Sequence, residues 1–370
     1  LLLHNSATHN ADLSIAGGSQ TSRYYTSFSY TNQEGTIINT GFQRYAGKVR
    51  LDNDLSDKVR TNININYSYT NNAGVVGDYS NPIYNTTLNT KDISEYTSIS
   101  ENLYAEYQLL ETLRLTGRLG IVHKQTDSDL FKPAGHTDFI NMTDAFTKGS
   151  YAQSNGKYND ISGDLGASYS IQIDKHLLFA NAQANFSNNV YSTTDVLAVG
   201  FANDFMDDIS FAVQYEKNGK PTGTEGILRT VGGLLSLNYS FDERYLFDAN
   251  YRITGSSETA PEHRWGKFWS LGAGWNLHNE AFMQGADWLN RMKLRASLGY
   301  TGSQGFSSYN AKSTFSYFSD QSYDGYIGSY IRSLANPALH WQEKYDFDLG
   351  VDLIFGQLGG RCNRDLLALA

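Results

Sequence analysis

Aromatic side chains crowd one long polar segment of this chain, residues 302–343, and they are the groups best suited to binding a ligand. They are Tyr317, Phe318, Tyr323, Tyr326 and Tyr330. An aromatic face stacks on the apolar C–H groups of a sugar, and a loop on a rigid scaffold can present such a face. We therefore predict these five as substrate-binding residues, with packing between loops as the alternative role.

Residues that could perform catalysis do not form a recognisable arrangement. The eight His are scattered without an H-E-x-x-H pair, and the single Cys offers no zinc site. The nucleophile-elbow and phosphate-loop motifs are also missing. Asp207 and Asp208 could act as paired glycosidase carboxylates, but adjacent acids in a polar segment are more often solvated. The sequence predicts no enzyme, no metal site and no cofactor.

The charge balance excludes one class of partner. The formal net charge is -9 and the pI is near 5.4. A nucleic-acid-binding protein would carry a basic stripe to contact phosphates, and the sequence shows none. The lone Cys362 cannot form an internal disulfide.

The elements that must position these side chains are two-faced strands. In residues 344–353, apolar and polar side chains alternate without a fault. Tyr345, Phe347, Leu349, Val351 and Leu353 point to one side. The same alternation recurs along nearly the whole chain, so one face of each strand must be hidden from water.

Thirteen strands are predicted, near 12–17, 23–31, 43–53, 59–70, 101–110, 113–123, 158–171, 177–188, 230–241, 244–254, 265–277, 292–301 and 344–354. Several reach the roughly 9–11 residues that a tilted strand needs to cross a bilayer. Short connections, such as 57–58, 111–112, 174–176 and 242–244, alternate with long ones at 71–100, 124–157, 189–229, 255–264 and 302–343. The connection 278–291 lies at the end of the strands with short turns but is longer, and we predict that it is an extended periplasmic turn. This alternation is typical of a membrane β-barrel.

Composition agrees with a barrel. Aromatic residues make up 14% of the chain, enough to supply girdles at two membrane interfaces. No run approaches the roughly 18 apolar residues of a membrane-spanning helix, and the mean hydropathy of -0.45 fits strands with one wet face. The rival interpretation is a surface-exposed β-rich binding or adhesion protein. Its aromatic residues would fill an inner core, whereas a barrel concentrates them near strand ends.

Tryptophans in 264–275 offer a second possible sugar platform. Trp269 and Trp275, however, alternate in step with Leu271 and Ala273. That parity favours a position facing lipid or in an interfacial girdle over a binding role.

Five motifs in order resemble those of SusC/RagA-type TonB-dependent transporters. The first is Tyr24-Tyr25 followed by Tyr30-Thr31-Asn32-Gln33-Glu34-Gly35, similar to Y-Y-x-S-x-x-Y-x-N-Q-E-G. Residues 241–257, FDERYLFDANYRITGSS, resemble a hairpin of the family's barrel. Residues 264–276, RWGKFWSLGAGWN, resemble RWG…P-S-x-x-x-GWN with Trp269 in place of Pro. Residues 293–304, KLRASLGYTGSQ, resemble K-L-R-x-S-x-G-x-T-G-N-Q with Ser303 in place of Asn. Residues 336–343, NPALHWQE, resemble N-P-x-L-x-W-E with Gln342 inserted.

The resemblance implies a bacterial outer-membrane barrel that takes up a glycan oligosaccharide or a peptide. Its implied partners are a SusD-like surface lipoprotein as lid, outer-membrane lipid, and the TonB complex acting through a plug and TonB-box that this sequence lacks. The family barrel has 22 strands, so residues 1–355 are expected to form an internal barrel fragment. Residues 356–370 are expected to be a divergent tail, a deletion or frameshift scar.

The expected fold is all-β: an antiparallel meander of about thirteen strands, neighbours in chain order, with two open edges. Lipid should meet Ile63, Ile65, Tyr67, Phe347, Leu349 and Val351. The concave side should carry Asn64, Asn66, Asp348 and Asp352. Further lumen charges, Asp346, Arg295, Arg252 and Asp248, are expected to form charge ladders across neighbouring strands.

Overall fold

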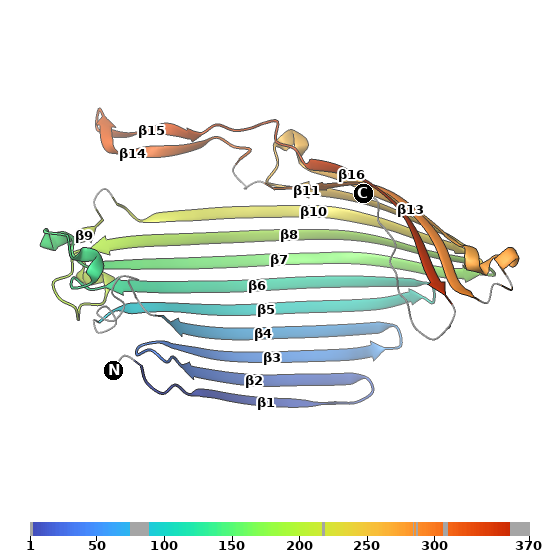
Figure 1. The fold of residues 1–370 in the computed structure, drawn as a ribbon, viewed down its shortest axis with the longest axis horizontal. Helices are drawn as coiled ribbons and strands as arrows, with labels where there is room; N and C mark the ends of the chain where they lie inside the picture. Colours follow the sequence, from blue (N-terminus) through green and yellow to red (C-terminus); the bar gives the residue numbers. More distant parts are fainter. Residues whose placement is uncertain are drawn as a thin grey trace.

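Fourteen strands join into one antiparallel sheet in which chain neighbours lie side by side (Figure 1). The computed structural model describes residues 3–74, 89–216, 219–283, 285, 288–305 and 310–355. The sheet strands are β1 (Thr8–Gly18), β2 (Ser22–Glu34), β3 (Gly41–Ser56), β4 (Val59–Ala73), β5 (Lys91–Leu110), β6 (Leu113–Lys132), β7 (Ser150–Ile173), β8 (His176–Val199), β9 (Gln214–Tyr215), β10 (Thr222–Phe241), β11 (Tyr245–Ser256), β12 (Trp265–Asn276), β13 (Leu289–Ser303) and β16 (Gln342–Phe355).

Two further strands form a separate hairpin, β14 (Thr314–Tyr323) and β15 (Tyr326–Ser333). Short 3-10 helices occupy the connections: η1 (Thr137–Phe139), η2 (Ala145–Thr147), η3 (Ile209–Phe211), η4 (Pro261–His263), η5 (Leu277–Asn279) and η6 (Ala281–Met283). In the described part of the chain, no helix is long and apolar enough to cross a membrane. The predicted tail 356–370, with Cys362, lies outside the described residues.

The predicted meander is confirmed. All thirteen predicted strands occur in the expected order, and β1 and β16 each pair on one side only, which leaves the sheet open. The sequence missed β9, β14 and β15, which lie in segments assigned to long connections. It also made five strands too short: the structure extends β5, β6, β7, β8 and β10 outward to Lys91, Lys132, Ser150, Val199 and Thr222. Those extensions carry polar residues on both faces, so they show no alternation of apolar and polar residues.

Strand register fixes which side chains share a face. Leu349 lies opposite Ala296, whereas Asp348 lies opposite Ser297. Asp348 and Ser297 line the hollow of the concave face. Leu349 also borders this hollow, but its side chain alternates with that of Asp348 and so belongs to the convex side, and it is 60% exposed.

The same two faces continue through the ladder from β16 to β4. One side carries Ile63, Ile65, Tyr67, Phe347, Leu349 and Val351, and the other carries Asn64, Asn66, Asp348 and Asp352. This is the division that the alternation predicts. Large apolar side chains remain exposed along the convex side, as on a surface that meets lipid.

Aromatic rings lie near the ends of the strands on that convex side. Tyr30, Tyr45 and Tyr69 form a row on β2, β3 and β4 at the end with long connections, with ring centroids 4.9 and 6.2 Å apart. At the end with short turns, Tyr245 stacks on Trp275 at 6.3 Å. Rows at strand ends are the arrangement expected of a barrel with interfacial girdles, and differ from the filled inner face of a sandwich.

The extended connection after β12 is fastened to the sheet by Glu280, which is 8% exposed. Its carboxylate accepts a hydrogen bond from Nε1 of Trp275 at 2.9 Å and lies 3.4 Å from Nη1 of Arg244. The Trp275 donation, followed by one from Tyr245, holds the pKa of Glu280 below its usual value. One carboxylate thus joins the aromatic row to the turn that follows it.

Replacing either neighbour on β16 by Lys tests the assignment of faces. Leu349→Lys places an ammonium on the predicted lipid face, which costs about 2–4 kcal/mol at mid-bilayer, whereas Asp348→Lys changes a charge in the wet lumen. We expect Leu349→Lys alone to reduce the fraction of protein that migrates as a folded, heat-modifiable band in outer-membrane preparations. Equal loss in both variants would contradict the assignment.

Acid titration tests the Glu280 cluster. A folded-state pKa below the unfolded value of about 4.3 means that the stabilisation is complete above that pH. It is lost as the pH falls through the lower folded-state pKa. Glu280→Gln should therefore lower Tm at pH 7 and show a shallower fall in Tm between pH 6 and 3.

The control for this titration is Glu111→Gln. Glu111 lies on the exposed turn between β5 and β6, where it makes no ion pair within the described residues. This variant should follow the unsubstituted protein at every pH. Parallel curves for Glu280→Gln and the unsubstituted protein would show that the carboxylate does not stabilise the turn.

Candidate functional site

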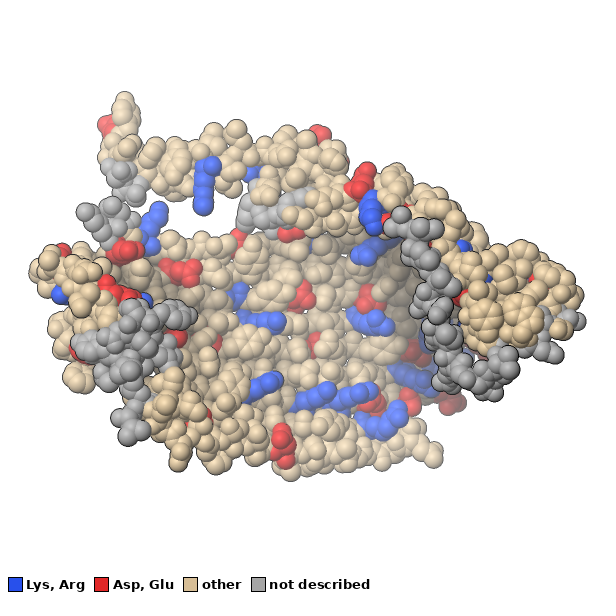
Figure 2. Space-filling model, viewed as in Figure 1, with Lys and Arg blue, Asp and Glu red and all other residues tan. Residues whose placement is uncertain are grey.

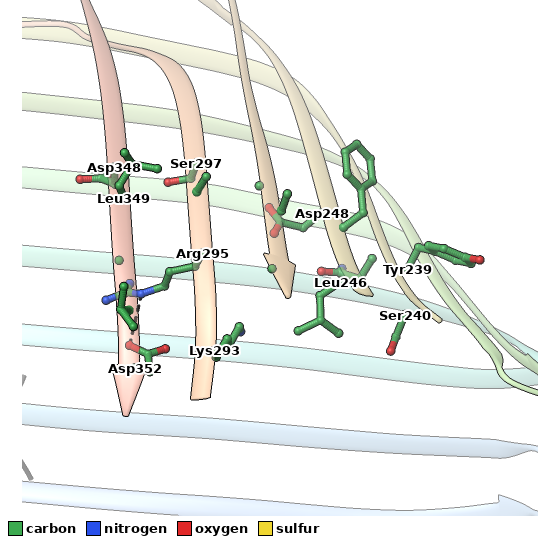
Figure 3. A pocket seen from close by; sticks show the side chains of 18 of the residues that line it. Tyr239, Ser240, Leu246, Asp248, Lys293, Arg295, Ser297, Asp348, Leu349 and Asp352 are labelled. Atoms are coloured by element: carbon green, nitrogen blue, oxygen red, sulfur yellow. Dashed lines mark ion pairs between the residues drawn. The ribbon is translucent and has the colours of Figure 1, made fainter. Parts of the chain in front are cut away.

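A hollow of about 970 Å³, lined by both charged and apolar side chains, lies on the concave face over β10 to β13 and β16 (Figure 3). Asp248, Lys293, Arg295, Asp348 and Asp352 line it. Nε of Arg295 lies 3.4 Å from Oδ1 of Asp352 on the next strand. Lys293, Asp248 and Asp348 form no ion pair within the described residues. The wall therefore offers charges of both signs to whatever fills the barrel.

The predicted charge ladder is shorter than expected. Arg295 and Asp352 are the cross-strand pair, and Lys344 pairs with Asp346 along its own strand. Nε of Arg252 donates to Oγ1 of Thr254 at 3.1 Å and has no carboxylate partner in the described chain. These side chains keep the lumen polar without forming a continuous network.

Glycines lie directly beneath two of these charged side chains. A Cβ atom on Gly272 would collide with the Asp248 carboxylate, and one on Gly350 would collide with the Arg295 side chain. Each charged side chain therefore lies flat across a glycine of the neighbouring strand. Gly in the middle of a strand marks such a close approach. Few side chains therefore protrude from this part of the sheet, and a folded domain in the lumen can approach the strands closely.

The long connections at the opposite end of the sheet build a small core of their own. Phe131, Tyr151 and Phe201 are 0–3% exposed and pack against one another, with ring centroids 5.1–6.4 Å apart. Nζ of Lys91 lies 3.2 Å from the Tyr151 hydroxyl and 3.7 Å from Asp129. This is the hydrophobic core cluster of the described chain. It could not be predicted from the sequence because its members come from segments that are separate and largely polar.

The five predicted binding aromatics all lie on the β14–β15 hairpin, which Figure 1 shows apart from the row of barrel strands. Tyr323 pairs with Tyr326 beside the tip, and Ser316 pairs with Tyr330. The Phe318 and Tyr330 rings are 5.1 Å apart, and Phe318 lies across Gly328. Alternation along β15 then places four of the five on one face, which we call the tyrosine face: Phe318, Tyr323, Tyr326 and Tyr330.

Tyr317 lies on the opposite face of the hairpin. It pairs with Ser329, and its neighbour Phe315 pairs with Ile331. Tyr317 is 71% exposed, close to the 78% of Tyr326. The register shift between Tyr317 and Ser322 separates residues that look equivalent in the sequence. The structure therefore brings together four of the predicted residues and leaves Tyr317 apart.

The other candidates take structural positions. Asp208 caps η3, where its carboxylate accepts hydrogen bonds from the Oγ and N of Ser210 at 2.6 and 2.9 Å. These hydrogen bonds lower the pKa of Asp208, and the bond from Oγ contributes most. Trp269 and Trp275 lie on the convex face opposite Tyr300 and Leu294, as their parity predicts. No group of His, Cys, Asp and Glu that could hold a metal ion occurs in the described ranges.

An aromatic pair at the mouth of the concave face was not predicted. The rings of Phe268 and Trp341 meet edge to face at 5.3 Å, above positions where Gly266 and Gly302 leave space. Trp341 belongs to the Asn336–Glu343 motif, which was the available signal. Its pairing with a residue on β12 depends on how the segment before β16 folds back.

No family model matches this sequence. The chain is 24% identical over 385 residues to TonB-dependent receptor P26 of Formosa agariphila, a match covering 95% of this chain and 38% of that protein. It is 25% identical over 409 residues to TonB-dependent receptor SusC of Bacteroides thetaiotaomicron, covering 94% and 39%. The chain thus spans about two fifths of the length of these curated relatives.

Solved structures share the fold. The RagAB peptide importer in its closed-closed state matches with a TM-score of 0.75 and 21% identity over 94% of this chain and 42% of that one. The closed form of the ferric-catecholate import receptor Fiu from E. coli matches with a TM-score of 0.56 and 10% identity, covering 94% and 55%. At these identities the structural matches establish the barrel fold alone.

The comparisons confirm the resemblance to SusC/RagA-type TonB-dependent transporters and the all-β barrel architecture. TonB-dependent receptors are outer-membrane β-barrel proteins, so the chain belongs to the bacterial outer membrane. The matched proteins are receptors and transporters rather than enzymes, which confirms the non-catalytic prediction. In such barrels short turns face the periplasm and long loops face outward. The β14–β15 hairpin is therefore extracellular.

Proposed function

We propose that this chain forms part of the wall of a barrel through which an oligomeric nutrient, a glycan oligosaccharide or a peptide, enters across the outer membrane. The supporting observation is the curved sheet with an apolar convex face and a charged concave face. A wall of this kind separates lipid from a wet passage.

The energy for uptake comes from the TonB complex acting on a plug in the lumen, as the names of the relatives suggest. Around Asp248 and Arg295, the charged side chains lie flat over glycines. This surface suits such a plug because a folded domain can approach the strands closely. The unpaired Lys293, Asp248 and Asp348 offer it polar contacts that can be exchanged for water at little cost.

On the outer side, a SusD-like lipoprotein closes over the barrel mouth and the nutrient is held beneath it. The extracellular loops, with their own core of Phe131, Tyr151 and Phe201, are rigid enough to support such a lid. The tyrosine face supplies the contact to the nutrient. The rings of Tyr323, Tyr326 and Tyr330 are exposed, and Tyr323 pairs with Tyr326 beside the tip.

Loss of the TonB complex tests the proposed energy source. Cells that express the protein should take up the nutrient and lose that uptake when TonB is deleted, while the amount of protein in the outer membrane stays the same. Complementation with TonB on a plasmid is the control. Uptake that continues without TonB would refute energised transport and leave a passive pore.

Substitution of the tyrosine face tests the contact with the nutrient. Replacing Phe318, Tyr323, Tyr326 and Tyr330 by Ala should weaken capture about tenfold or more, since each loss of about 1.4 kcal/mol is a factor of ten. Barrel assembly should be intact because loops at a barrel mouth contribute little to strand pairing. Growth on the nutrient, with surface expression measured in parallel, is the readout.

The matched control is Tyr317→Ala. Tyr317 is on the same hairpin and similarly exposed, but on the opposite face. It should leave capture unchanged. If both variants impair growth equally, the hairpin acts by packing. If neither does, the nutrient is bound by the plug or by the lid.

A further inference from the structure

Two basic side chains stand unneutralised on the concave face of β3. Arg44 lies opposite Thr31 and Thr70, and Lys48 lies opposite Ser27 and Asn66. Alternation places both on the side of Asn64 and Asn66, which is the concave side. Figure 2 shows Lys and Arg side chains gathered over the lower strands of this face.

The cations nearer the periplasmic end of the same strands are paired. Nε of Arg50 lies 2.9 Å from Asp52, and Nε of Arg60 lies 3.2 Å from Asp54. Arg44 and Lys48, by contrast, have no carboxylate within 4.0 Å in the described residues. On β3 and β4, the cations without a carboxylate partner therefore lie toward the extracellular end.

The neighbours of Arg44 and Lys48 on β2 and β4 are neutral and rich in hydrogen-bonding groups, and Asp12 on β1 shares the concave face two strands away. Thr31, Thr70, Ser27 and Asn66 are their direct neighbours, and Nδ2 of Asn66 donates to Oγ of Ser100 at 3.2 Å. Hydroxyls and amides can bind polar groups of a ligand without neutralising the two cations. An unpaired guanidinium and ammonium beside them attract anionic oxygens.

The spacing of the two cations suits an extended ligand. Residues four apart on one strand are separated by about 14 Å, because a strand rises about 3.4 Å per residue. An oligomer lying along β3 could place one acidic group on each cation. The chain as a whole carries a net charge of -9. The positive potential around Arg44 and Lys48 is therefore opposite in sign to the charge of the protein as a whole.

We propose that Arg44 and Lys48 form a subsite for anionic groups, carboxylate or sulfate, on the oligomer that enters this barrel. The subsite rests on the proposed uptake function and narrows its substrate class to acidic oligomers. Arg44, near the extracellular end of β3, makes the first contact, and Lys48 holds a second acidic group deeper in the lumen.

Binding to the complete protein, purified from the outer membrane in detergent, tests the subsite. The probes are tetragalacturonate and its neutral methyl ester, together with tetraglutamate and tetraglutamine peptides, so that acidic glycans and acidic peptides are compared. Calorimetry of the variant Arg44→Gln/Lys48→Gln should show about tenfold or more weaker binding of the acidic probe, and that binding should weaken with salt in the unsubstituted protein. Binding of the neutral probes should be unchanged.

Arg50→Gln is the matched control. Arg50 is a concave-face cation on the same strand, already paired with Asp52, and its loss should leave binding of the acidic probe unchanged. Equal losses in the control and the test variant would overturn the proposal, as would unaltered binding in the test variant. Failure of both acidic probes to bind the unsubstituted protein would also overturn it.

The acidic probe that binds identifies the ligand source, glycan or peptide. Failure of the subsite is distinguishable from failure of the proposed function. Energised uptake is judged by its loss without TonB, and the subsite by the dependence of binding on Arg44 and Lys48. TonB-dependent uptake of a neutral nutrient, with no charge effect on binding, would leave the function standing and remove the subsite.

Discussion

The hydrogen-bonded ladder from β1 to β16 is the constraint on which the rest of this structure depends. In a bilayer no water can satisfy a backbone N–H or C=O, so strands must pair without interruption. The ladder runs from Thr8 to Phe355 with register shifts only at isolated places, such as Ser56 and Leu110, close to short turns. Because side chains alternate, this register also decides which residues meet lipid and which meet the lumen. A slip of one residue would exchange the two faces.

The strand register determines the two faces but does not determine which polar residues the lumen face carries. The charge and the height of the side chains on that face vary along the sheet. Over β11 to β16, charged side chains lie flat on glycines, as Asp248 does on Gly272, and cations and anions are both present. Over β3, Arg44 and Lys48 have neutral neighbours on β2 and β4 and no ion pair within the described residues, and Asp12 on β1 shares their face two strands away. The first region suits close contact with a folded body, and the second suits an anionic ligand. One sheet thus provides two kinds of wall.

The strands could be predicted from the sequence because the membrane imposes a simple rule on them. Leu349 and Asp348 reveal their faces by alternation alone, as do Trp269 and Trp275. Outside the bilayer that rule no longer applies. The outer part of β5, from Lys91, is polar on both sides, and the core of Phe131, Tyr151 and Phe201 unites residues up to 70 positions apart. Sequence alternation carries no information about such contacts. The register shift between Tyr317 and Ser322 is likewise invisible in the sequence, and it places Tyr317 and Tyr323 on opposite faces although their spacing implies one face.

In the two proposals, the hairpin and the cations Arg44 and Lys48 serve different steps of recognition. A two-stranded hairpin in water is marginally stable, and the exposed rings of Tyr323 and Tyr326 gain from contact with a ligand. Stacking on a ring is tolerant of sequence and orientation, so it captures many oligomers weakly. Two cations at strand positions about 14 Å apart would select oligomers by the charge and the spacing of their acidic groups. Capture by rings at the outer tip followed by selection by charge at the wall places the tolerant contact before the discriminating one. On the two proposals, an oligomer without acidic groups would still contact the tyrosine face but would gain no charge-assisted hydrogen bond at Arg44 and Lys48.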